Sequence, residues 1–176
     1  MSDLPEWTGP PKMVGGHVAG PRFIARSANV VVAIRQVLAY PNGVEINIEA
    51  HAFGPSADGS SPVRGPSSAD GAFFNHQPRF AVGFADGTEV VLDDEYWLRG
   101  GRGPTLMVSK AERGSGGPDN HEDANLALWL WPLPPAGPLT LTCTWERRGL
   151  DASTVLDGNA IRAAAEHAIP FWPEHP

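Results

Sequence analysis

A run of side chains that can bind metal ions or transfer protons lies at residues 119–123, Asp-Asn-His-Glu-Asp. Together with His76, the residues His121, Glu122 and Asp123 are candidate ligands of a mixed imidazole and carboxylate metal site. Their spacing matches neither a His-Glu-x-x-His helix nor a calcium-binding loop, and a glycine-rich segment precedes them. We therefore favour a solvated acidic loop over a metal site.

A second candidate site lies at residues 93–99, Asp-Asp-Glu-Tyr-Trp-Leu-Arg. Tyr96, Trp97 and Arg99 are candidate ligand-binding residues, because aromatic rings beside acidic groups suit a sugar or a cationic peptide. The alternative, which we favour, is a strand end whose charges discourage pairing with another chain.

The remaining candidates for catalysis are one cysteine and six histidines. Cys143 lies on the same strand face as Leu141 and Trp145, which predicts a buried small hydrophobic residue rather than a nucleophile. The histidines are dispersed, and the sequence has no Gly-x-Ser-x-Gly elbow and no phosphate-binding glycine loop. We expect no catalytic residue and no cofactor, which favours a non-enzymatic protein over an enzyme.

The composition limits the classes of partner. The 176 residues are enough for one domain with a core, and the formal net charge of −7 opposes binding to nucleic acid or to an anionic membrane. The single cysteine excludes an intrachain disulfide, and no apolar run is long enough to cross a membrane. The first residues lack the features of a signal peptide, so we expect a soluble, cytoplasmic protein.

Strand patterns dominate the C-terminal half. Residues 126–131 are apolar on both alternating faces, which predicts a strand covered on both sides. Residues 139–145 alternate between apolar side chains and threonine, which predicts a strand with one buried face and one face exposed to solvent. Trp129 and Trp131 share a face, and we interpret them as core residues rather than as an exposed binding platform.

Two hairpins and two further strands complete the expected sheets. Asn42-Gly43 and Asp86-Gly87 are strong hairpin turns, and Gly83 predicts a bulge or a close backbone approach within its strand. The predicted strands other than the two described above span residues 29–40, 44–53, 79–85, 88–93, 105–109 and 153–156.

One helix is expected at about 158–169. Asp157 can cap its N-terminus, Ile161 and Ile169 are its expected anchors, and Pro170 ends it. We expect the tail at 171–173 to pack beside the helix.

Three segments should lie outside the strands. Residues 1–27 are rich in proline and glycine and predict an extended N-terminal arm held by Trp7 and Phe23. The stretches 54–77 and 99–124 read as two long loops, whose composition favours disorder.

These patterns predict a mostly β protein. We expect an antiparallel β-sandwich, Ig-like or jelly-roll-like, with seven or eight strands, one short C-terminal helix and two long loops. Its single domain would span residues 28–176.

Several segments resemble a family of small bacterial proteins of unassigned function. The shared pattern is Trp-x-Trp-Pro-Leu-Pro-Pro-x-Gly-Pro-Leu, an apolar strand ending x-Cys-x-Trp, an Asp-led helix and a terminal Trp-Pro-Glu; both hairpins also match. The resemblance supports the fold and implies no activity. Its C-terminal residues here are Trp129, Trp131, Pro132, Leu133, Pro134, Pro135, Gly137, Pro138, Leu139, Cys143, Trp145, Asp157, Ile161, Trp172, Pro173 and Glu174.

Three functions remain open from the residues. The first is a non-enzymatic β-sandwich that acts through protein–protein contacts, including a homodimer formed through a sheet face. The second is a small-ligand or carbohydrate-binding module, with a cleft between the long loops at one end. The third is a metal-dependent enzyme that uses the candidate ligands at 76 and 121–123.

Overall fold

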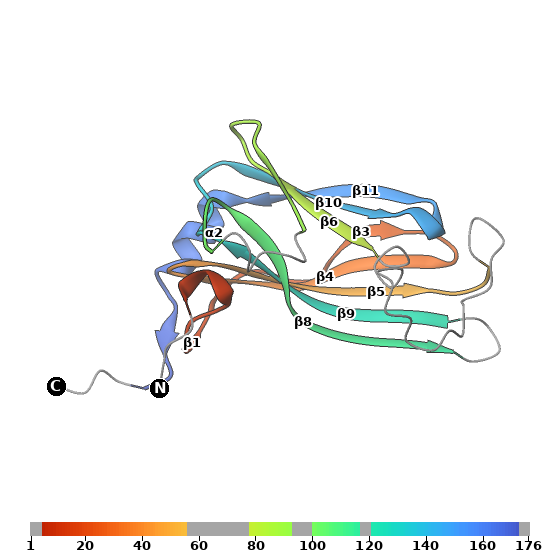
Figure 1. Cartoon of the computed structure of the whole chain (residues 1–176), viewed down its shortest axis with the longest axis horizontal. Coiled ribbons are helices and arrows are strands. Elements are labelled where there is room, and N and C mark those ends of the chain that lie inside the picture. The colour runs from red at the N-terminus through yellow and green to blue at the C-terminus, as the bar shows by residue number, and fades with distance from the viewer. Residues whose placement is uncertain (1–4, 56–77, 93–99, 117–120, 173–176) are drawn as a thin grey trace.

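Two antiparallel sheets pack face to face in the computed structural model, which describes residues 5–55, 78–92, 100–116 and 121–172 (Figure 1). Hydrophobic residues from both sheets meet between them, among them Ile34 and Ile48 of one sheet and Phe80 and Leu141 of the other. The predicted β-sandwich is therefore confirmed.

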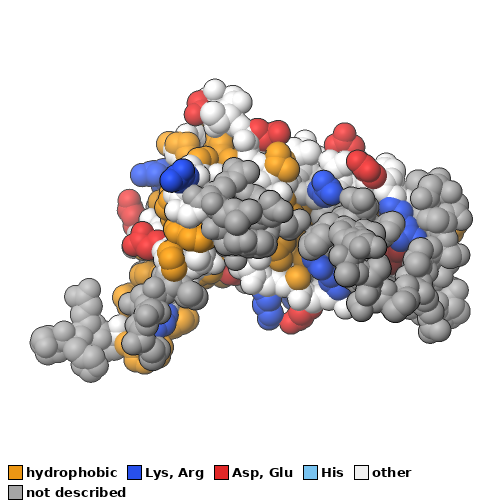
Figure 2. All heavy atoms as spheres, in the orientation of Figure 1, with side chains coloured by type: hydrophobic (Ala, Val, Ile, Leu, Met, Phe, Trp, Pro, Cys, Tyr) orange, Lys and Arg blue, Asp and Glu red, His pale blue; other side chains and the backbone are white. Residues whose placement is uncertain are grey.

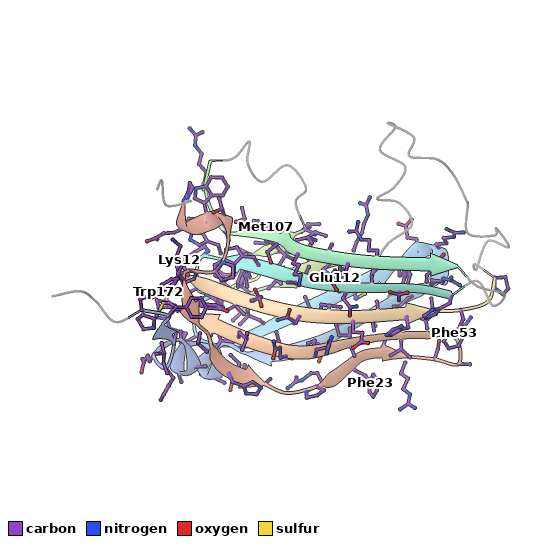
Figure 3. All side chains as sticks on the ribbon, turned by 90° about the horizontal axis from the view of Figure 1, so that it is seen from below. Lys12, Phe23, Phe53, Met107, Glu112 and Trp172 are labelled. Atoms are coloured by element: carbon purple, nitrogen blue, oxygen red, sulfur yellow. The ribbon has the colours of Figure 1, made fainter. Side chains whose placement is uncertain are left out.

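The large sheet holds six strands in the order β2-β4-β5-β9-β8, with β3 also paired to β4. Its outer face, which points away from the second sheet, is seen in Figure 3. The bounds of these strands are β2 (Gly16–Ala19), β3 (Arg22–Arg26), β4 (Val30–Tyr40), β5 (Gly43–Ala52), β8 (Thr105–Gly116) and β9 (His121–Trp131).

The small sheet has the order β11-β10-β6-β7. Its strands are β6 (Arg79–Gly83), β7 (Glu89–Val91), β10 (Pro138–Trp145) and β11 (Leu150–Asp157). A separate two-stranded ribbon joins β1 (Met13–Val14) to β12 (Ile169–Pro170), and two 3-10 turns lie at η1 (Glu6–Thr8) and η3 (Glu146–Arg148).

The alternation of side chains creates the core as predicted. In β5 and β10 every second residue is buried, and the threonines of β10 are only partly covered. Cys143 is fully buried, as expected, and burial, followed by the nearby Asp151 carboxylate, raises the pKa of its thiol to about 12. The thiol is therefore protonated and sheltered at neutral pH, unlike a catalytic cysteine.

Both predicted hairpins are present. Asp86 accepts hydrogen bonds from the backbone nitrogen and the hydroxyl of Thr88, at 2.9 and 2.7 Å, and Gly87 takes a positive φ of 86°. Gly43 is required by space, because an added Cβ would lie 2.6 Å from the carbonyl oxygen of Leu130. The prediction for Gly83 is wrong: its strand pairs without a bulge, and an added Cβ would meet nothing closer than 3.9 Å.

The predicted long loop at 99–124 is largely a hairpin. Strand β8 continues to Gly116 and β9 begins at His121, so most of this stretch is paired backbone. The sequence suggested a loop because β8 is an edge strand, and its C-terminal half carries exposed charges at Lys110, Glu112 and Arg113. Edge strands carry such charges to avoid pairing with other chains. The other predicted loop, 54–77, lies almost wholly outside the described residues.

The helix α2 (Gly158–Ala165) covers one end of the sandwich and ends sooner than expected. The side chain of Asp157 accepts a hydrogen bond from the backbone nitrogen of Asn159 at 2.8 Å, and Ile161 is fully buried, both as predicted. Ile169 is not an anchor, because it lies in β12 and is 64% exposed. Phe171 and Trp172 do not pack beside the helix but stand exposed.

Part of the predicted N-terminal arm belongs to the large sheet. Strands β2 and β3 pair with β4, and the Phe23 side chain is 55% exposed, so it does not hold the segment down. Trp7 lies directly against Gly101, and Asn42 donates a hydrogen bond to the Glu6 carbonyl at 3.0 Å. These contacts hold the N-terminal turn against the sandwich.

Candidate functional site

The candidate metal ligands His121, Glu122 and Asp123 lie in strand β9 and not in the solvated acidic loop that we favoured. Glu122 lies between the arginines of η3, with its Oε2 atom 3.0 Å from Nη2 of Arg148 and its Oε1 atom 3.7 Å from Nη1 of Arg147. A carboxylate held by two largely buried arginines is a structural ion-pair partner rather than a metal ligand. His76 lies outside the described residues. Within the described ranges, no three His, Cys, Asp or Glu side chains converge to hold a metal ion.

The candidate ligand-binding residues Tyr96, Trp97 and Arg99 also lie outside the described residues. The cleft that we expected at the loop end of the sandwich therefore stays a prediction.

The paired tryptophans are part of a second, smaller core on the outer face of the large sheet. Trp129 is fully buried and meets Tyr40 edge to face, with ring centroids 5.8 Å apart. Burial, followed by the charge of Glu45, raises the pKa of Tyr40. This confirms that Trp129 is a core residue and not a stacking platform; Met107 completes the cluster, with Met13, Leu38 and Trp131 packed against it.

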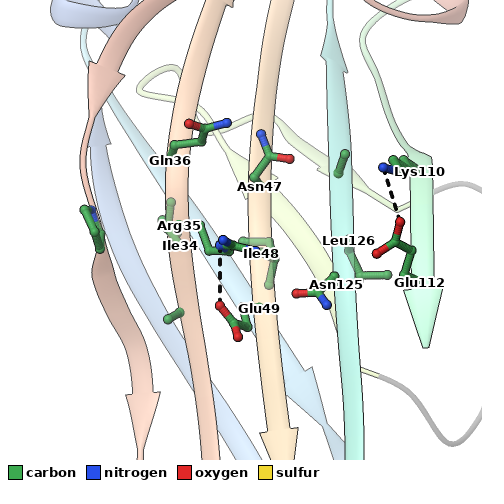
Figure 4. Close-up of a pocket in the computed structure, with 13 residues that line it drawn as sticks. Ile34, Arg35, Gln36, Asn47, Ile48, Glu49, Lys110, Glu112, Asn125 and Leu126 are labelled. Carbon is green, nitrogen blue, oxygen red and sulfur yellow. Dashed lines mark ion pairs between the residues drawn. The ribbon is translucent and has the colours of Figure 1, made fainter. Parts of the chain in front are cut away.

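A hollow of about 600 Å³ lies on this outer face beside the second core (Figure 4). Its floor is formed by sheet backbone and by two small side chains, Ala33 of β4 and Ala127 of β9. Longer side chains on the neighbouring strands surround the two alanines. Ala33 is in register with Glu49, and Ala127 is in register with both Asn47 and Lys110. We call this hollow the outer groove.

The charged side chains of the outer groove neutralise one another. Nε of Arg35 lies 3.5 Å from Oε2 of Glu49, and Nζ of Lys110 lies 3.3 Å from Oε1 of Glu112. Figure 4 shows the two ion pairs on opposite sides of the groove. The groove therefore presents no net charge from these four residues.

Three carboxamides share the groove with the ion pairs. Gln36, Asn47 and Asn125 come from the adjacent strands β4, β5 and β9. Asn47 donates a hydrogen bond to Glu45 at 2.9 Å, whereas the carboxamide oxygen of Asn125 has no hydrogen-bond partner among the described residues. An amide both donates and accepts hydrogen bonds, so these three side chains can contact a ligand that does the same.

The sequence alone did not single out these residues. Polar side chains on a strand are equally typical of a plain face exposed to solvent. The signal that was present is the pair of alanines Ala33 on β4 and Ala127 on β9, because small residues leave a depression between long ones.

A histidine pair lies beyond the groove on the same face. Nδ1 of His51 lies 3.4 Å from Nε2 of His121, and the ring planes differ by 4°. Glu49, which lines the groove, also contacts His51. Sequence spacing missed this pair because the two histidines are 70 residues apart and meet only through the pairing of β5 with β9.

Comparison with protein-family models, with characterised proteins and with solved structures gives no match. The resemblance described above therefore stays a prediction. Among the described residues, no helix is long and apolar enough to cross a membrane.

Proposed function

We propose that the protein is a non-catalytic binding module and that its outer groove takes a neutral, polyhydroxylated ligand, an oligosaccharide chain. The observation that carries this proposal is the set of three carboxamides that line the groove together with two internally paired sets of charges. This assigns the carbohydrate-binding function to a sheet face rather than to the loop end.

The chemistry of the lining favours a neutral ligand. An anion would have to compete with Glu49 and Glu112 for the cationic side chains, and a cation would have to compete with Arg35 and Lys110. A hydroxyl group both donates and accepts, as a carboxamide does, so it can form hydrogen bonds without breaking either ion pair. Asn125 can turn toward a ligand without losing a bond to its carboxamide oxygen.

The shape of the groove favours a chain over a single small molecule. The lining residues run across β4, β5, β9 and β8, and Pro21 extends the lining beyond β4. Strands in a sheet are about 4.8 Å apart, so four of them alone give the groove a length of about 14 Å. Phe23 is in register with Ala33 and places an exposed aromatic ring at the β3 edge (Figure 3).

A nuclear magnetic resonance titration tests this proposal. The probes are neutral malto-, cello- and chito-hexaoses, added separately to protein labelled with ¹⁵N. We expect one of them to shift the side-chain amide signals of Gln36, Asn47 and Asn125 in a saturable manner. We expect Ala127→Trp, which fills the floor of the groove, to abolish these shifts.

The matched control is Thr142→Ala, on the outer face of the small sheet, which should leave the titration unchanged. No saturable shift with any of the three oligosaccharides, or shifts that persist in Ala127→Trp, would contradict the proposal. Circular dichroism of each variant confirms that it is folded.

A second function, contact with another copy of this chain, is favoured by a different observation. Four large apolar side chains are exposed on the β1–β12 ribbon or directly after it. They are Val14 (56% exposed), Ile169 (64%), Phe171 (56%) and Trp172 (65%). Figure 2 shows hydrophobic side chains at the surface where this ribbon leaves the sandwich. Each ribbon strand has one paired edge among the described residues, so its other edge can pair with the ribbon of a second copy.

Light scattering after size exclusion tests the dimer. We expect a concentration-dependent shift from monomer to dimer, and we expect Ile169→Ser combined with Trp172→Ser to keep the protein monomeric. Val91→Ser, which changes an exposed apolar residue of the small sheet, is the control. A monomer at every concentration would rule out the dimer and leave the groove proposal intact.

A further inference from the structure

The two imidazoles of His51 and His121 meet edge to edge. Their facing nitrogens are 3.4 Å apart, and their ring centroids are 5.6 Å apart with the planes 4° from parallel. A centroid separation this much larger than the nitrogen separation requires the two rings to lie nearly in one plane, nitrogen toward nitrogen. The nature of this contact depends on where each ring carries its proton.

Glu49 determines the proton position on His51. Its Oε1 atom lies 2.8 Å from Nε2 of His51, and an ionised carboxylate only accepts hydrogen bonds. Nε2 of His51 therefore carries a proton. In the neutral ring, Nδ1 is then left with a lone pair that points toward His121.

Asp123 has the corresponding effect on His121. Its Oδ1 atom lies 3.9 Å from Nδ1 of His121, which is too long for a hydrogen bond but favours a proton on that nitrogen. The neutral tautomer then has its lone pair on Nε2, which faces His51. Gly114 provides the room for this carboxylate, because an added Cβ there would lie 2.6 Å from Oδ1.

Two lone pairs that face each other repel, and either a proton or a metal ion between them removes the repulsion. We propose that Nδ1 of His51 and Nε2 of His121 are the protein ligands of a Zn²⁺-type divalent ion. A tetrahedral zinc ion with Zn–N bonds of about 2.0–2.1 Å holds two ligand nitrogens about 3.4 Å apart. This separation matches the one between the two rings.

The surroundings of the pair fit an exchangeable metal site. Each outer nitrogen faces a carboxylate, the arrangement by which proteins orient metal-binding histidines and raise their basicity. The side chains of His51 and His121 are 35% and 43% exposed, so the rings can turn until both lone pairs point at one ion, with water as the other ligands. The site does not depend on the oligosaccharide proposal.

Calorimetric titration with ZnCl₂ tests the site, using full-length protein without a histidine tag in a buffer that does not chelate zinc. We expect one saturable site. His51→Gln and His121→Gln should each weaken zinc binding at least 10-fold. Glu49→Gln, which removes an orienting carboxylate, should weaken it about 10-fold.

Two matched controls should bind zinc as the unmodified protein does. They are His17→Gln, at an exposed histidine of β2, and Glu112→Gln, at another carboxylate of the same face. Circular dichroism verifies that every variant is folded.

The ¹⁵N signals of the imidazole rings give a second measurement. Zinc should change the signals of Nδ1 of His51 and Nε2 of His121. The absence of saturable zinc binding, or unchanged affinity in both histidine variants, would overturn the proposal. A contact bridged by a proton in place of a metal would give that result, with ring signals that respond to pH and not to zinc.

Discussion

Glu122 of β9 and Arg148 of η3 join the two sheets at the end of the sandwich away from α2 (Figure 1). The guanidinium of Arg148, whose side chain is 1% exposed, also donates hydrogen bonds to the carbonyl oxygens of Gly54 and Pro55, at 2.9 and 3.3 Å. Arg147 approaches the other carboxylate oxygen of Glu122. The carboxylate is thus the common partner of two buried cations.

Glu122→Gln should therefore destabilise the fold. The change removes the carboxylate that contacts two largely buried guanidinium groups, so we expect the free energy of unfolding to fall by about 3 kcal/mol. Urea unfolding followed by circular dichroism measures it. Glu112→Gln breaks the exposed pair with Lys110 and should cost no more than about 0.5 kcal/mol. Equal losses in the two variants would contradict a structural role for Glu122.

The buried thiol of Cys143 should make the fold sensitive to alkali. The folded-state pKa is raised from 9.0 to about 12, so an unfolded chain loses this proton at a lower pH than the folded protein does. The contribution of Cys143 to stability is complete below pH 9 and declines as the pH rises from 9 toward 12, by about 1.4 kcal/mol for each pH unit. The slope should become shallower by this amount in Cys143→Ala, measured by urea unfolding at several pH values. The same slope in both proteins would assign it to other groups.

Two glycines in strands should respond in opposite ways to replacement by alanine. A Cβ at Gly16 of β2 would lie directly on the carbonyl oxygen of Ala164, so Gly16→Ala should displace α2 and cost about 1–3 kcal/mol. A Cβ at Gly83 of β6 meets only Thr140, at 3.9 Å. Gly83→Ala should raise stability by about 0.5 kcal/mol, because the unfolded chain loses freedom. Thermal melting ranks the two variants, and a neutral Gly16→Ala would show that the helix is not docked as described.

The cap of α2 gives a further test. Asp157→Ala removes the hydrogen bond to the backbone nitrogen of Asn159 and should lower the free energy of unfolding by about 1 kcal/mol. Asp157→Asn keeps a side-chain oxygen at the cap and should cost little. The melting temperatures of the two variants distinguish these effects. If both fall by a similar amount, the charge of Asp157, and not its hydrogen bond, stabilises the helix.

Local patterns predicted the body of the fold. All eight strands expected from alternation and turns are present, because β5 and β10 have one apolar face and their turns contain the residues that tight turns need. The structure adds β1, β2, β3 and β12 from segments rich in glycine and proline. These strands are short, and β1 and β12 pair only with each other, Met13 with Pro170, so no local pattern indicates that ribbon. Strand β3 does pair locally with β4, Arg26 with Val31, but it lacks a tight-turn signal such as Asn-Gly.

The candidate site was less predictable, for the same reason. The outer groove depends on which polar residues of β4, β5, β9 and β8 lie side by side, and this is set by register over long sequence separations. The sequence pattern placed Glu122 and Asp123 together among the candidate ligands of one site. In the strand they point to opposite faces, Glu122 toward the arginines between the sheets and Asp123 toward the histidines outside.

The β1–β12 ribbon also bears on how the chain can be connected. Met13 and Pro170 are direct partners across it, although 156 residues separate them in sequence. A linker that joined the segments flanking this ribbon would therefore connect backbone that already lies close together. A circular permutant reopened at the exposed Asp86-Gly87 turn should assemble the same sandwich, because among the described strands only the β6–β7 hairpin is closed by that turn.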